Sequence, residues 1–254
     1  MVLDRVVDRA ILENRPDVAV FLGFTFVMVG FVSSVFLFNS AISISMVGLS
    51  SLLILPYMIK ILKPDSPDYT SIFSRRNKYL KFYAFLFLGM SLAYTLLFGT
   101  LSPAMLEKSF SNQLEVVGSG VGGMLAFPTL FYIQIVANNL LIVSIAIILS
   151  FVYGAGSVFV LNYNASIAGV VYGSAINAFL WGGIPLFSNP IAYLPHTILE
   201  ILAYLIAALA GTIITKPLTK ENGRLIGRDA SIMVAAAYIL IFVAAWVEVT
   251  VPFL

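Results

Sequence analysis

Seven runs of about 20 predominantly apolar residues follow one another along this chain of 254 residues. A helix of that length rises 1.5 Å per residue and crosses the roughly 30 Å of hydrocarbon in a bilayer. Only 10% of the residues are charged, whereas soluble domains carry roughly 25%. The sequence therefore predicts an all-α, polytopic membrane bundle. The predicted spans cover residues 18–38, 42–62, 82–101, 130–153, 157–180, 195–215 and 230–249.

We expect these spans to form a single integral membrane domain over residues 1–254. Within it, residues 18–62 form an N-terminal helical hairpin, residues 80–215 a core, and residues 230–250 a C-terminal span. Residues 2–12 place apolar side chains on one helical face and charged ones on the other. This pattern predicts a short amphipathic helix, which lies either on the membrane surface or against a cytosolic loop of the same protein.

The segment 102–127 is predicted to be an interfacial helix outside the cell. Ser102 before Pro103 resembles an N-cap with proline at the first helical position, and apolar residues then recur at helical spacing. Residues 118–123, Gly-Ser-Gly-Val-Gly-Gly, are expected to end this helix as a flexible joint. They match the G-x-G-x-x-G pattern of dinucleotide sites, but no strand precedes them and no βαβ unit surrounds them, so a phosphate loop is not expected.

The distribution of basic residues predicts the orientation. With a cytoplasmic N-terminus and an extracellular C-terminus, all but one of the 14 Lys and Arg residues fall on the cytoplasmic side, the exception being Lys108. This asymmetry follows the positive-inside rule. The net charge of +2 suggests no nucleic-acid partner, and the absence of cysteine excludes disulfides and thiolate metal sites. We therefore expect a multi-pass protein of the cell membrane.

Polar side chains gather in the fourth, fifth and sixth spans. His196, the only histidine, lies one helical turn before Glu200, so both occupy one face of a helix. A carboxylate inside a membrane needs donors or a proton, and amides can supply the donors. We expect a polar cluster between these spans, with Asn177 as a further amide of the fifth. It consists of His196, Glu200, Asn138, Asn139, Asn164, Asn162 and Gln134.

There are two principal hypotheses for the role of this cluster. Its members could hydrogen-bond across helices and hold the bundle together, at about 1 kcal/mol or less per pair. They could instead form a cation or proton site of a transporter or channel. Catalysis fits poorly: one His and one Glu cannot provide the three protein ligands of a catalytic zinc, and neither H-E-x-x-H nor G-x-S-x-G occurs. No catalytic residue, metal or cofactor is predicted, and Glu248 is expected to be interfacial.

The fifth span also carries Ala165, Gly169 and Gly173 at four-residue spacing. Small residues repeated in this way let another helix approach closely. We expect this ridge to pack helices and, in the bilayer, to support a homodimer.

Four motifs occur in order over residues 80–215: Asn138-Asn139, Gly154-x-Gly156, Asn164-x4-Gly169 and Pro195-His196-x3-Glu200. In this respect the chain resembles the stage II sporulation protein M family, with its N-N, G-G, N-G and P-H-G-x-x-E patterns. Two glycines of that pattern are replaced, by Ala165 after Asn164 and by Thr197 after His196. Both replacements add a side chain, which hinders the close approach of another backbone at these two positions.

The resemblance implies an integral membrane protein without enzymatic activity of its own. The founding member belongs to a membrane complex that localises peptidoglycan hydrolases during engulfment, although the family also occurs in organisms that make no spores. The leading expectation is a membrane scaffold or assembly component, with a membrane or extracellular protein partner left open. The alternative is a proton- or cation-linked transporter or channel that uses Glu200 and His196.

Overall fold

A computed structural model describes residues 14–39, 41–62, 76–126, 128–187, 189–214 and 223–250. These residues form helices and connecting turns, with no strand among them. The amphipathic helix predicted for residues 2–12 lies outside the described residues. The helices are α3 (Pro16–Leu37), α4 (Ile42–Leu62), α6 (Arg76–Thr100), α7 (Pro103–Ser109), α8 (Ser111–Ala126), α9 (Pro128–Tyr153), α10 (Val158–Trp181), the 3-10 helix η1 (Pro190–Tyr193), α11 (Leu194–Ile214) and α12 (Gly223–Thr250).

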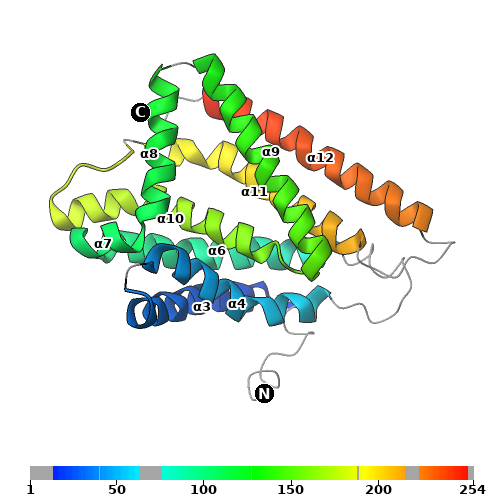
Figure 1. Ribbon diagram of the computed structural model, residues 1–254, viewed down its shortest axis with the longest axis horizontal. Helices are drawn as coiled ribbons and strands as arrows, with labels where there is room; N and C mark the ends of the chain where they lie inside the picture. Colours follow the sequence, from blue (N-terminus) through cyan, green and yellow to red (C-terminus); the bar gives the residue numbers. More distant parts are fainter. Residues whose placement is uncertain are drawn as a thin grey trace.

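Seven of the described helices are long and apolar enough to cross a membrane, namely α3, α4, α6, α9, α10, α11 and α12. The predicted all-α bundle and its number of spans are therefore confirmed. Successive spans run alternately from one end of the molecule to the other (Figure 1). On the peripheral helices α3, α9 and α12, large apolar side chains such as Phe21, Leu141 and Ile239 are exposed, as expected for surfaces that face lipid.

Helices α3, α4, α6 and α10 form one packed group, which we call the N-terminal group. Its centre is α6, which packs against both α3 and α10. A Cβ added at Gly169 of α10 would lie only 2.4 Å from the Cβ of Tyr94 on α6, and one added at Gly173 would lie 2.8 Å from the Cβ of Phe98. The two helices therefore approach closely along the predicted small-residue ridge, whose third member, Ala165, is fully buried.

This arrangement changes the expectation about the homodimer. The ridge of Ala165, Gly169 and Gly173 was expected to serve a second copy of the chain, but its two glycines are covered by α6 of the same chain. Intramolecular packing uses the close-approach surface because α6 and α10 run parallel to each other as neighbours, with Gly169 opposite Tyr94 and Gly173 opposite Phe98. A homodimer would need a different surface.

Helices α9, α11 and α12 form the second packed group, the C-terminal group. Gly211 of α11 lies against α9, since a Cβ there would be 2.5 Å from the carbonyl oxygen of Ile147. The two groups are joined by the tight turn predicted at residues 154–156, where Gly154 has φ +70°. The Thr212 hydroxyl donates to the carbonyl of Gly154 at 2.9 Å, which ties this turn to α11.

Helices α7 and α8 replace the single interfacial helix that was predicted. Ser102 has extended backbone angles and Pro103 follows at the first helical position, as expected. The glycine-rich stretch 118–123 is helical within α8, so the prediction of a flexible joint was wrong. Glycine costs only about 1 kcal/mol per residue in a helix, and the start of α8 is tied to α4 and α10 by hydrogen bonds of Gln113. Figure 1 shows α8 lying across the ends of the neighbouring spans.

Candidate functional site

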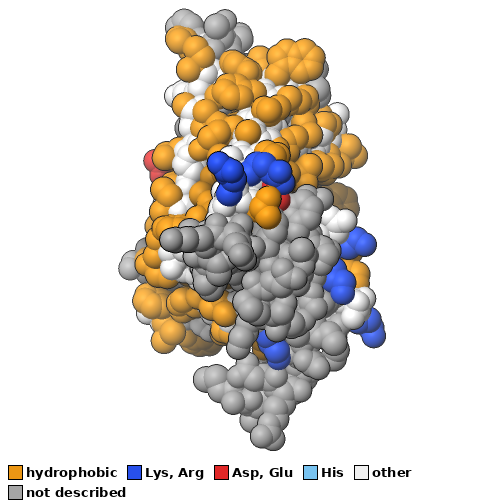
Figure 2. Space-filling view, turned by 90° about the vertical axis from the view of Figure 1, so that its right-hand side faces the viewer, with side chains coloured by type: hydrophobic (Ala, Val, Ile, Leu, Met, Phe, Trp, Pro, Cys, Tyr) orange, Lys and Arg blue, Asp and Glu red, His pale blue; other side chains and the backbone are white. Residues whose placement is uncertain are grey.

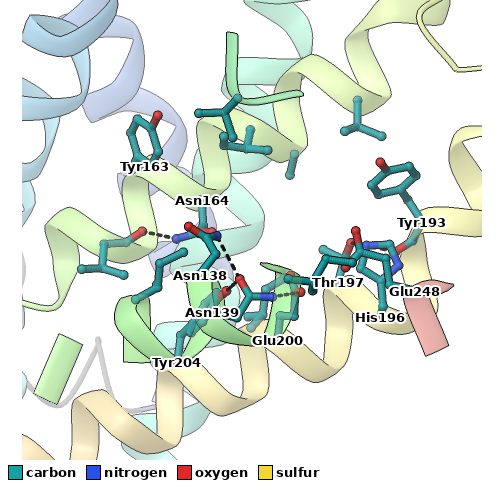
Figure 3. Close-up of a pocket in the computed structure, with 18 of the residues that line it drawn as sticks. Asn138, Asn139, Tyr163, Asn164, Tyr193, His196, Thr197, Glu200, Tyr204 and Glu248 are labelled. Atoms are coloured by element: carbon teal, nitrogen blue, oxygen red, sulfur yellow. Dashed lines mark hydrogen bonds between the residues drawn. The ribbon is translucent and has the colours of Figure 1, made fainter. Parts of the chain in front are cut away.

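A cavity of about 760 Å³ lies between the two helix groups, and we call it the cleft. It is bounded by α9, α11 and the end of α12 on one side and by α10, α6 and α8 on the other. Its polar lining consists of Gln134, Asn138, Asn139, Tyr163, Asn164, Tyr172, Tyr193, His196, Thr197, Glu200, Tyr204 and Glu248. Figure 3 shows side chains of α9, α10, α11 and α12 around this cavity.

Glu200 is the central acid of the cleft. It lies six residues after the start of α11, and the Asn139 side-chain amide of α9 donates to its Oε1 atom. The Tyr204 hydroxyl donates to the Oδ1 atom of the same asparagine at 3.0 Å, and the Asn138 amide lies 3.4 Å from that oxygen. The chain of hydrogen bonds joins α9 to α11 and holds the carboxylate toward the cleft (Figure 3).

His196 lies one turn before Glu200, as the spacing predicted, and it is buried. Its ring packs edge-on against Tyr193, with the ring centroids 4.8 Å apart. Its Nε2 atom is 3.4 Å from the Thr197 hydroxyl, which itself donates to the carbonyl of Tyr193. The histidine therefore belongs to a compact group at the start of α11 that forms one end of the cleft.

Glu248 is the functional candidate that the sequence interpretation missed. It was expected to be interfacial, but it is half-buried and lines the cleft together with Glu200. The signal was present in the spacing, because Glu248 continues the stripe of fully buried residues formed by Ile241, Ala244 and Ala245.

Asn162 does not belong to the cleft, so its place in the predicted cluster was wrong. It is fully buried on the opposite side of α10. Its amide donates to the Val47 carbonyl at 3.0 Å and to the hydroxyls of Ser50 and Ser51 at 2.7 and 2.9 Å. Its Oδ1 accepts from Tyr94 at 3.1 Å. We call these residues the Asn162 network.

Helical geometry explains this separation. Asn162 and Asn164 are two residues apart and so point about 200° apart around the helix axis. Asn164 lines the cleft and donates to the carbonyl of Val160 in its own helix. Asn177 also lies away from the cleft: its amide donates to the carbonyls of Phe98 and Leu101 at the end of α6, at 3.0 and 2.9 Å.

A third polar contact, also not predicted, holds α8 in place. Gln113 of α8 is fully buried. Its Oε1 accepts from the Ser43 hydroxyl at 2.6 Å, and its amide donates to Ser166 at 3.0 Å. This side chain therefore links α8 to both α4 and α10, and it positions α8 as one wall of the cleft.

The charge of the cleft is one-sided. Two carboxylates face it, and none of the described residues that line it is Lys or Arg. Among the described residues, no group of three or more His, Asp and Glu side chains is placed to hold a metal ion. The arrangement can therefore accept a positive charge or protons from a ligand, and His196 is the one described lining residue that could itself become a cation beside the acids.

Comparison with family models gives a match to stage II sporulation protein M over residues 81–251. The chain belongs to this family. The match includes α12 as well as the region that contains the four motifs. The family region therefore extends beyond residues 80–215, over which the resemblance was recognised from the motifs. Glu248, near the end of α12, lies within the family region, whereas the hairpin of α3 and α4 lies before it. No curated protein and no solved structure matches the chain.

Proposed function

We propose that this family member is a non-enzymatic membrane transport protein that binds a cation, or exchanges protons, in the cleft. The observation that carries the proposal is that Glu200 and Glu248 line one cavity, and that no Lys or Arg in the described part of the chain lines it. Inside a membrane, an unbalanced carboxylate costs several kcal/mol, on the order of 3 on insertion scales. A bound cation or proton removes this cost, so the cleft favours such an occupant.

The packing of the two helix groups favours a transport protein, whose parts move, rather than a rigid binding site. Helix α10 packs extensively against α6 but touches α9 and α11 only sparsely. The cleft therefore lies at the boundary between two internally well-packed groups. Relative movement of two such groups around a central site is a common basis of alternating access. The turn at Gly154 is the shortest of the covalent connections between the two groups, because the other two run through α7 and α8 and through η1.

Flux measurements in proteoliposomes test the proposal. We expect the purified protein to dissipate a gradient of H⁺, Na⁺ or K⁺, or to exchange one of them for a cationic solute. Glu200→Gln and Glu248→Gln should each lower this flux at least about tenfold, because each removes a charge from the cleft. Glu107→Gln, at an exposed position on α7, is the matched control and should leave the flux unchanged. Wild-type protein that moves none of these ions would overturn the proposal.

Family membership favours a second candidate, a membrane scaffold or assembly component. The hydrogen bonds that join Asn139 to Glu200 and Tyr204 suit this role, because they connect α9 to α11 without any ligand. A glutamine at position 200 keeps a hydrogen-bonding group, so a purely structural role predicts that Glu200→Gln is mild and that Glu200→Leu lowers the melting temperature. Transport predicts that Glu200→Gln abolishes flux while the melting temperature is retained.

For the orientation, we propose a cytoplasmic N-terminus and an extracellular C-terminus. Lys60, Lys78, Lys81 and Arg224 lie at the same end of the bundle, where α4 ends and α6 and α12 begin. Figure 2 views this end and shows Lys and Arg side chains gathered there. Because the chain contains no cysteine, Glu107→Cys and Arg224→Cys each create a single labelling site. An impermeant maleimide added to intact cells should label the first only; labelling of both would refute the topology.

A further inference from the structure

The cleft changes character along its length. Its inner part lies near the turn between α9 and α10, where it is lined mostly by apolar side chains, and Tyr163 and Asn164 also line it there. The apolar residues are Ile142, Ile145, Phe159 and Ile167. Its outer part lies near the start of α11 and the end of α12, where His196, Glu200 and Glu248 line it. By helical rise, Ile145 is about 14 Å from the Gly154 turn, while Glu248 is about 38 Å from the inner end of α12. Glu248 therefore lies toward the outer end of a largely apolar cavity, whereas Glu200, which bonds Asn139, lies about one turn from Ile142 and borders the apolar part.

The acidic end also presents aromatic rings. Tyr172 and Tyr193 line it, and Tyr193 packs between Phe187 and His196, with centroid separations of 4.8 Å to each. An aromatic face attracts a cation that lies within about 6 Å, and the attraction is stronger for a cation that has left water. Carboxylates beside tyrosine rings suit an organic ammonium group better than a small, strongly hydrated metal ion.

The cleft opens toward the side of the bundle along α9. Gln134, Asn138 and Ile145 line the cavity and are nonetheless exposed on this membrane-spanning helix. The same helix exposes Leu141 and Ile148 to the surroundings of the bundle. A molecule in the bilayer can therefore reach the cavity sideways, with its polar end near the headgroup level and its apolar part at the depth of the acyl chains.

We infer that the ligand of the cleft is a cationic amphiphile, with an ammonium head held by Glu200 and Glu248 and an apolar tail along Ile142, Ile145 and Phe159. This inference rests on the proposed cation site and names its ligand class. The volume of about 760 Å³ lies within the range of about 300–1,000 Å³ that is typical of cavities for drug-sized ligands. A bare inorganic cation would leave most of this apolar cavity unoccupied.

Equilibrium binding in nanodiscs tests the inference with three probes: methylammonium, dodecylammonium and dodecanol. Empty nanodiscs provide the blank for partition into lipid. We expect dodecylammonium to bind at least about tenfold more tightly than methylammonium, and dodecanol to show no binding above the blank. Glu200→Gln should weaken both ammonium probes at least about tenfold, because the charge they share is recognised by the acids.

Two variants report on the tail alone. Ala168→Phe and Ile145→Trp place larger side chains in the apolar part of the cleft, away from the acids. Each should weaken dodecylammonium at least about fivefold and leave methylammonium unchanged. Ile145 is exposed, so its variant remains informative if Ala168→Phe does not fold.

The outcomes separate this inference from the proposed function. Equal affinity for methylammonium and dodecylammonium, or equal binding of dodecanol and dodecylammonium, would overturn the amphiphile. Flux of H⁺, Na⁺ or K⁺ that depends on Glu200, without any binding of dodecylammonium, would also overturn it while leaving the proposed cation site intact. Absence of both flux and ammonium binding would remove the two proposals together.

Discussion

The Asn162 network and the cleft contain similar polar groups within the membrane-spanning bundle, but the space around these groups differs. In the Asn162 network, one fully buried amide reaches the Val47 carbonyl and three hydroxyls from Ser50, Ser51 and Tyr94, and Asn162 does not line the cleft. In the cleft, the amides and carboxylates line about 760 Å³ of open space. The comparison shows that the type of polar residue does not decide its role; what decides it is whether neighbouring helices fill the space around it.

This difference follows from which helices meet at each place. The Asn162 network lies where α10 meets α4 and α6, and glycines such as Gly169 let these backbones approach closely. The cleft lies where α10 faces α9 and α11, with which it has few contacts. A close approach leaves room only for groups that bond one another, whereas a loose boundary leaves polar atoms available to a ligand.

The largest expected difference in stability is between larger side chains introduced on the two sides of α10. Gly169→Val should lower the free energy of unfolding by about 3 kcal/mol, because a Cβ there already lies 2.4 Å from Tyr94 Cβ. Ala168→Val, at the neighbouring position that lines the cleft, should cost less than about 1 kcal/mol. Reversible denaturation in detergent measures both. Equal losses would show that both sides of α10 are equally filled.

A second comparison concerns the two asparagines of α10. Asn162→Leu should cost about 2 kcal/mol, because it removes several buried hydrogen bonds, including the one that Tyr94 donates to Oδ1. Asn164→Leu should cost less than about 0.5 kcal/mol, since its amide bonds a carbonyl of its own helix. Thermal unfolding of the two variants side by side provides the measurement. A larger loss for Asn164→Leu would contradict the assignment of the two faces.

The smallest expected effect concerns two buried tyrosine hydroxyls. Tyr94→Phe should cost about 1 kcal/mol, because the Oδ1 atom of Asn162 would lose its donor in a filled interior. Tyr204→Phe should cost about half as much, because Asn139 borders the cleft, where another donor can replace the hydroxyl. The melting temperatures of these variants should therefore differ in this order. The reverse order would indicate that the cleft is closed and dry.

Much of the fold was predictable because membrane insertion imposes rules that act locally. A run of about 20 apolar residues must be helical and must span, so seven spans could be placed and were confirmed. The Gly154 turn and the Ser102-Pro103 helix start also depend on local backbone preferences. The helical glycine stretch in α8 was not predicted, because the contacts that stabilise α8, such as those of Gln113, join residues far apart in the chain.

The candidate site was predictable only in part. The spacing of His196 and Glu200 placed both on one face, and the structure brings Gln134, Asn138, Asn139 and Asn164 to the same cleft. The grouping of Asn162 with them was wrong, although its offset of two residues from Asn164 pointed to the opposite face. Glu248 could have been recognised from its register with Ile241 and Ala245, but which helix this stripe would face was not readable.

By itself, then, the sequence determined the class of protein, the number of spans and the residues that had to be paired within the membrane. These properties depend on the transfer of single segments from water into hydrocarbon, which is a local matter. The tertiary structure alone decided that the small-residue ridge is covered by α6, that Glu248 joins Glu200, and that the space around them stays open. Those properties depend on which helices approach closely, and that is settled by packing between segments distant in the chain.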